Sequence, residues 1–164
     1  GRVPPSEQTW RHRMSYSTVK DVIDYSQTLH EHARNLYQQL RDQTQRDRVD
    51  MMLQLLAEHE NTLAQSMENL KGRASEKVLS EWHQFEPGSI SEALDGCKDC
   101  HPDMSVDELT HIALRIDDYL ISLYRQMASE STNSDSRQLF ENLVQLEETE
   151  KVRTVRAALS ANDW

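Results

Sequence analysis

The sequence contains few of the residues that interrupt helices. It has only four glycines, four prolines and two phenylalanines among its 164 residues. Sheet proteins use glycine and proline at their many turns, so this scarcity favours long helices instead. A chain of this length can bury one ordinary hydrophobic core, and we therefore expect a single all-α domain.

Basic residues are also in the minority. Lysine and arginine number 18 against 28 aspartates and glutamates, which gives a formal net charge of −10. A phosphate backbone would be repelled by this charge, so we expect no nucleic-acid partner. No apolar run reaches the length of a membrane span and no apolar signal segment is visible, so we expect no membrane partner and a cytoplasmic location.

The first residues differ from the rest in composition. Residues 1–13 are polar, contain Pro4 and Pro5, and precede Met14. We interpret them as an N-terminal extension or a cloning remnant, and assign the fold to residues 14–164.

Apolar residues at steps of three and four predict four helices in two hairpins. The hairpins cover about residues 17–72 and 105–160, and residues 73–104 connect them. Thr18 begins the first hairpin and Ser105 the second, and each is followed three residues later by an acid that can complete a capping box.

The two hairpins also resemble each other. A shift of 87 residues aligns both pairs of helices without a gap, which indicates a duplicated helical hairpin. We therefore expect a four-helix bundle of two duplicated hairpins joined by a long crossover. The identical pairs are Leu36-Tyr37 with Leu123-Tyr124, Gln39 with Gln126, Leu56 with Leu143, Glu60 with Glu147, and Thr62 with Thr149.

Ionisable side chains interrupt the apolar stripes of all four helices. Each helix contributes one such residue at or beside its stripe, and the last helix contributes a second, one turn further on. An unpaired carboxylate in an apolar core is costly, so these acids must share protons, pair with cations, reach water or bind a metal ion. The residues are His30, Glu60, Asp117, Glu147 and Glu150.

Simpler interpretations exist for the individual residues. Asp117 and Glu150 could lie at the edge of a stripe and reach water, and His30 could be a hydrogen-bonded core histidine. The recurrence of glutamate at positions 60 and 147 favours a metal site instead.

Neighbouring polar side chains have secondary roles in this interpretation. We expect His32 and His59 on solvated faces, where they are reserve ligands only. Tyr37 and Tyr124 should pack in the core, with hydroxyls hydrogen-bonded to the carboxylates.

These helices resemble the ferritin-like superfamily, and most closely its rubrerythrin-type domains. The matching segments are "HEHARNLYQQL" with "LAEHENTLAQ", and "IDDYLISLYRQM" with "LVQLEETEKV". That family twice pairs a helix bearing glutamate seven residues before a tyrosine with a helix bearing Glu-x-x-His, and binds two iron ions between them. The resemblance implies a metal-binding protein with non-haem iron oxidoreductase activity or a role in iron and peroxide handling.

The ligand set departs from the family pattern. Glu60 and Glu147 match its bridging acids, but His30 and Asp117 replace two glutamates, and Leu63 and Glu150 replace both histidines. We therefore predict an altered metal site of His30, Glu60, Asp117, Glu147 and Glu150, backed by Tyr37 and Tyr124. Its candidate metals are iron, as a pair or a single ion, and zinc.

A second motif lies in the connection between the hairpins. Cys97-x-x-Cys100-His101 has the pattern of a c-type haem attachment site, but haem attachment needs an exported chain, so we do not expect haem. The cysteines could instead form a thiol pair or reversible disulfide, contribute with His101 to a zinc site, or have no chemical role. The alternative function is therefore a non-enzymatic bundle that acts as an interaction or redox-sensing module through this loop.

The connection also carries apolar side chains outside the four helices. Val78, Leu79, Trp82 and Phe85 could bury against a second copy of the chain or cover one end of their own bundle. On the first interpretation we predict a homodimer.

Overall fold

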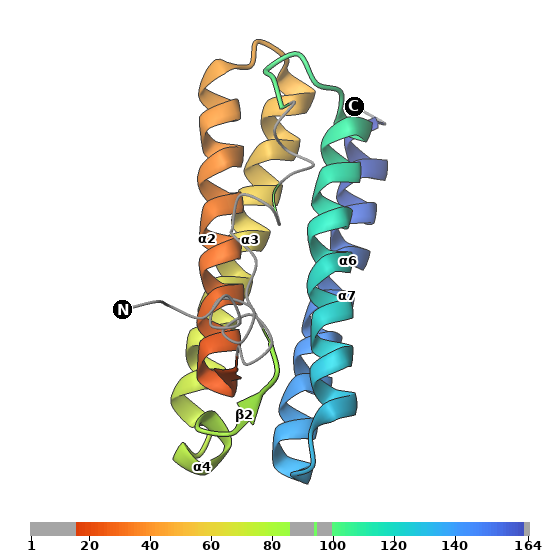
Figure 1. The fold of residues 1–164 in the computed structure, drawn as a ribbon. Coiled ribbons are helices and arrows are strands. Elements are labelled where there is room, and N and C mark those ends of the chain that lie inside the picture. Colours follow the sequence, from red (N-terminus) through yellow and green to blue (C-terminus); the bar gives the residue numbers. More distant parts are fainter. Residues whose placement is uncertain (1–15, 86–93, 95–99, 163–164) are drawn as a thin grey trace, which may run out of the picture.

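The computed structural model describes residues 16–85, 94 and 100–162. Four long helices dominate the fold, and Figure 1 shows them side by side as a bundle. The predicted all-α four-helix bundle is therefore confirmed. The helices are α2 (Val19–Gln43), α3 (Asp47–Arg73), α6 (Val106–Glu130) and α7 (Ser134–Asn162).

Three short elements close one end of the bundle. Strand β1 (Ser17–Thr18) pairs antiparallel with β2 (Trp82–His83), and the short helix α4 (Glu76–Leu79) lies between α3 and β2 in the chain. This pairing brings the segment after α3 back to the beginning of α2.

The two hairpins are joined across the length of the bundle. Helix α2 packs against α3, α6 against α7, and the hairpins meet mainly where α3 contacts α7. Strand β2 lies at the end of the bundle where α2 begins, whereas α6 begins at the opposite end (Figure 1). There Arg46 and Asp47 line one surface hollow together with Ser105 and Val106.

The helices begin at equivalent positions in the two hairpins. Val19 and Val106 are 87 residues apart, and so are Asp47 and Ser134. Both capping boxes form as predicted: the side chain of Thr18 accepts from the backbone N–H of Asp21, and that of Ser105 accepts from Glu108. This spacing is what a duplicated hairpin predicts, and the duplication itself stays a prediction.

The apolar stripes face inward and form one core. On α3, Leu53, Leu56, Leu63 and Met67 are no more than 2 % exposed. Full burial of such a side chain contributes about 1.5–3 kcal/mol to folding. Because Glu60 lies in the same stripe, the packing that stabilises the bundle also carries this carboxylate inward.

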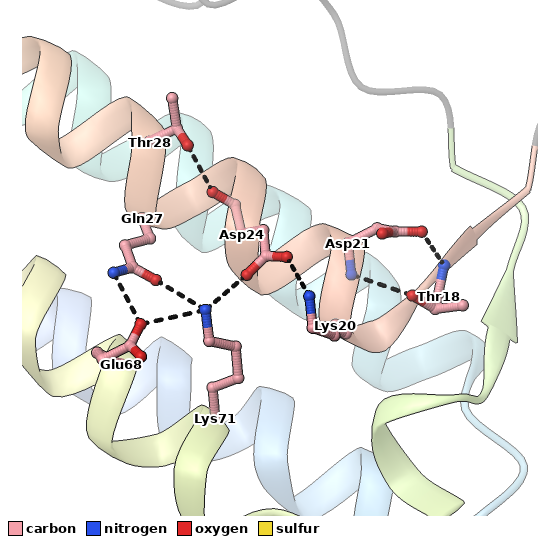
Figure 2. A network of polar contacts seen from close by, with 8 residues as sticks. All are labelled: Thr18, Lys20, Asp21, Asp24, Gln27, Thr28, Glu68 and Lys71. Atoms are coloured by element: carbon pink, nitrogen blue, oxygen red, sulfur yellow. Dashed lines mark hydrogen bonds and ion pairs between the residues drawn. The ribbon is translucent and has the colours of Figure 1, made fainter. Parts of the chain in front are cut away.

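A polar network on the outside of the bundle joins the first turns of α2 to the last turns of α3 (Figure 2). Lys71 of α3 donates to Asp24 of α2 at 2.8 Å and to Gln27 at 3.3 Å, and pairs with Glu68 at 3.1 Å. Burial alone would raise the pKa of Asp24, but the hydrogen bonds and charges of Lys20 and Lys71 outweigh it and lower that pKa. Exposed pairs of this kind each add little stability.

The apolar residues of the connection mostly cover their own bundle. Val78 is buried, and Leu79 and Phe85 are half-buried against the core. Trp82 is 65 % exposed. Of the four residues predicted to face a second copy, Trp82 is therefore the one that presents a large apolar surface to solvent.

Among the described residues, no helix combines the length and the apolar character needed to cross a membrane.

Candidate metal centre

Five ionisable side chains meet in the interior of the bundle. They come from all four long helices, and each is between 0 and 4 % exposed. We call them the acidic cluster. Its members are His30 of α2, Glu60 of α3, Asp117 of α6, and Glu147 and Glu150 of α7.

His30 lies between two carboxylates. Its Nδ1 contacts Oε2 of Glu60, and its Nε2 lies 2.7 Å from Oε1 of Glu147. Each of these two contacts needs a proton between nitrogen and oxygen, so either the ring is an imidazolium or one of the two carboxyls is protonated. Burial alone would lower the pKa of His30, but the charges and hydrogen bonds of Glu147 and Glu60 raise it well above its usual value.

Asp117 is held in its neutral form by its surroundings. Burial, followed by the negative charges of Glu147 and Glu60, raises its pKa to about 9, and His30 offsets part of this effect. A carboxyl with this pKa keeps its proton at neutral pH unless a further cation approaches it.

Glu150 contacts side chains that are partly or largely exposed. Its Oε1 accepts a hydrogen bond from Arg153 at 3.0 Å, and its Oε2 lies 3.7 Å from Nδ1 of His59. In the described part of the chain, Oε2 of Glu150 and Oε2 of Glu147 are buried with no hydrogen-bond partner. Two buried carboxylate oxygens without a donor are costly, and a bound cation would remove that cost.

The acidic cluster suits a hard divalent ion by its chemistry. Carboxylate oxygens are typical ligands of magnesium and manganese, and imidazole is a typical ligand of iron and zinc. Across the described ranges, however, no three His, Cys, Asp or Glu side chains already surround one point as a finished site. The donors therefore fit such an ion in type, and side-chain rotation would have to complete the coordination.

The two predicted tyrosines lie in the core. Tyr37 and Tyr124 are both fully buried. Burial and the charge of Glu147 raise the pKa of Tyr124, whereas a hydrogen bond with Ser26 acts in the opposite direction. The Tyr124 hydroxyl also donates to Sδ of Met67 at 4.0 Å, so its partners are Ser26 and Met67 rather than a carboxylate.

His59 lies closer to the acidic cluster than its position in the sequence suggested. We expected it on a solvated face, yet its side chain is only 19 % exposed and also lies 3.5 Å from Oγ1 of Thr154. The contact between α3 and α7 buries the edge of the stripe to which His59 belongs. The sequence places His59 directly before the inward-facing Glu60, which suggests that His59 could lie near the acidic cluster. Nothing in the sequence identified the helix that faces His59.

The cysteine motif is described only in part. Cys97 lies outside the described residues. Cys100 is half-buried against the core, and His101 is exposed, with its Nδ1 accepting from the backbone N–H of Asp103 at 3.2 Å. The thiol, disulfide and zinc interpretations of this motif thus stay predictions.

Comparisons with known proteins address the fold. No family model matches the chain, and no curated protein matches it significantly in sequence. A crystal structure from Thermotoga maritima, named as a ferritin-like diiron-carboxylate protein, matches with a TM-score of 0.58. It is 16 % identical, and the match covers 87 % of this chain and 95 % of that chain. At this identity the likeness concerns the fold alone, and the chain has a ferritin-like four-helix fold.

Proposed function

We propose that the protein binds a divalent metal ion in the acidic cluster, with Glu147 and Glu150 as the central ligands. The observation that carries this proposal is the pair of buried carboxylate oxygens on these two residues, which have no hydrogen-bond partner in the described part of the chain. Asp117, which interacts electrostatically with both glutamates, and the half-buried His59 supply additional donors.

Iron is the first candidate metal, and zinc is the second. The fold neighbour is named as a diiron-carboxylate protein, and the donors of this chain are hard enough for ferrous iron. Iron, when bound, supplies one-electron chemistry toward oxygen or peroxide, which would make the protein a non-haem iron oxidoreductase. The chain's own contribution is a buried site that excludes bulk water and a carboxyl, Asp117, that can release a proton.

The alternative function is a metal-free bundle that signals through the Cys97–Cys100 loop. The half-buried Cys100 packs against the core and so links that loop to the bundle. The two functions differ in metal content, which a single measurement separates.

The test is metal analysis of protein produced with iron, manganese or zinc supplied. We expect bound metal in the wild type, strong loss in Glu147→Gln and Glu150→Gln, and unchanged content in the control Glu148→Gln. Glu148 lies between the two ligands in sequence, but its side chain is 38 % exposed and pairs with Arg125 at 3.0 Å. A wild type without metal, or both ligand variants with wild-type content, would contradict the proposal.

A chelator supplies an independent readout of the same site. If the ion offsets the burial of Glu147 and Glu150, its removal should lower the melting temperature of the wild type. The same treatment should leave the melting temperature of Glu147→Gln nearly unchanged, because that variant has little metal to lose.

A further inference from the structure

We infer that Arg153 competes with the metal ion for Glu150, and that its guanidinium moves into solvent when the ion binds. This inference rests on the proposed function. It concerns how the chain regulates the affinity of the site, which metal binding alone leaves open.

Arg153 reaches the acidic cluster from the surface of the bundle. Its side chain is 56 % exposed, whereas that of Glu150 is 3 % exposed, and its Nη1 donates to Oε1 of Glu150 at 3.0 Å. Arg153 follows Glu150 by three residues on α7, a spacing that places the two side chains on the same face of the helix. One carboxylate oxygen of Glu150 is therefore already paired with a positive charge.

The other oxygen of the same carboxylate is the one left for a metal ion. Oε2 of Glu150 is buried, has no hydrogen-bond partner among the described residues, and lies 3.7 Å from Nδ1 of His59. An ion bound there would share one carboxylate with the guanidinium of Arg153, and the two positive charges would repel each other. The divalent ion carries the larger charge and would lie among buried oxygens, where water screens less, so Arg153 is the partner that leaves.

The two members of the ion pair differ in what separation costs them. The guanidinium of Arg153 regains its hydration when the flexible side chain turns outward. Glu150 has no such outlet, because a buried carboxylate without a cationic partner is strongly unfavourable. The contact with Arg153 thus stabilises the metal-free form more than the metal-bound form, and so lowers the affinity of the site for the ion.

Calorimetric titration of metal-free protein with Mn²⁺ tests this competition. We expect Arg153→Met, which has no donor and no charge, to bind Mn²⁺ roughly five- to tenfold more tightly than the wild type, between the values for an exposed ion pair and for a hydrogen bond to a charged group. The matched control is Arg156→Met, which removes the same charge from an exposed position one turn further along α7. Its affinity should change by less than about twofold, because solvent screens the more distant charge.

Thermal unfolding separates competition from the other roles that the ion pair could have. In Arg153→Met we expect a lower melting temperature of the metal-free protein, and a melting temperature near that of the wild type once Mn²⁺ is bound. Equal losses in both forms would indicate a purely structural ion pair. A larger loss in the Mn²⁺-bound form would indicate that Arg153 positions Glu150 for the ion. Either result would overturn the inference, as would an unchanged or weaker affinity of Arg153→Met.

The Arg153 side chain can also be followed directly in the wild type. Its guanidinium ¹⁵N relaxation should show an ordered group in the metal-free protein and a mobile group with diamagnetic Zn²⁺ bound. A guanidinium that stays ordered with Zn²⁺ bound would overturn the inference and leave the proposed function standing. No ion bound by either the wild type or Arg153→Met would overturn the proposed function, and this inference with it.

Discussion

At the residue scale, the buried protons of His30 and Asp117 should make the stability of the metal-free protein depend on pH. In the unfolded chain Asp117 titrates near its ordinary value of 3.8 and His30 near 6.5. In the folded chain both pKa values are raised, so the folded state binds more protons than the unfolded state above pH 6. The free energy of unfolding should therefore fall as the pH rises from 6 to 9, by roughly 1.4 kcal/mol per pH unit for each extra proton that the folded state retains.

Urea unfolding in the presence of a chelator measures this slope. The control is Asp117→Asn, which removes one of the two retained protons and should give a shallower dependence. Stability that stays flat or increases over this pH range would show that the acidic cluster does not hold these protons in the folded state.

At the residue scale the sequence identified the buried acids but not their partners. Glu60 and Glu147 fall on apolar stripes, and stripes are set by helical periodicity. The contact of His30 with both of them depends on how α2 is rotated against α3 and α7, and periodicity along one helix does not specify that rotation.

At the element scale, the capping boxes should contribute directly to helix stability. Ser105 Oγ accepts from the backbone N–H of Glu108 at 3.1 Å, and the Glu108 carboxylate accepts from the N–H of Ser105 at 3.3 Å. Ser105→Ala removes a partner of the first turn of α6 and should destabilise the protein by about 1 kcal/mol in urea unfolding.

The matched control for the cap is Ser122→Ala on the same helix. Ser122 is exposed in the middle of α6, where alanine is the better helix former. Its substitution should leave the stability unchanged or slightly increase it. Equal losses in the two variants would mean that the cap contributes nothing beyond the loss of a hydroxyl.

At the scale of the whole molecule, Glu81 connects parts of both hairpins. Its side chain accepts a hydrogen bond from the buried Ser136 of α7 and lies 3.0 Å from His83 Nε2, and its backbone carbonyl accepts from the N–H of Val19 at 2.9 Å. Ser136→Ala removes the bond to α7 and should destabilise the protein by roughly 1.5–3 kcal/mol, the range for a hydrogen bond to a charged group.

Hydrogen exchange shows whether that loss is local. We expect faster exchange at the beginning of α7 and at β2 in Ser136→Ala, with Ser160→Ala, exposed near the end of α7, as the control. Faster exchange in the control alone, or in neither variant, would contradict the prediction that Glu81 connects the two hairpins.

We also propose that the protein forms a homodimer through the face that carries Trp82. This side chain is 65 % exposed on β2, where Trp82 pairs with Thr18 of β1, and Tyr16, just before β1 in the chain, is 47 % exposed. Sedimentation at high micromolar concentration should show a dimer in the wild type and more monomer in Trp82→Ala. Tyr119→Ala, which removes an aromatic side chain of α6 that is 37 % exposed, is the control. A wild type that stays monomeric would end this proposal.

The sequence by itself determined the helices and their order. Capping boxes and the three-to-four spacing of apolar residues act over one or two turns, so they can be recognised in the sequence without knowing the fold. Equal spacing in the two halves then predicted two hairpins and their crossover, and a bundle of this kind necessarily carries Glu60 and Glu147 inward.

Only the tertiary structure decided which side chains meet. It brought His30 between two glutamates, placed His59 beside Glu150, and covered one end of the bundle with Val78. These contacts depend on the rotation and axial offset of each helix against its neighbours. The packing of all the side chains in the core sets both quantities together, so no single segment of the sequence contains them.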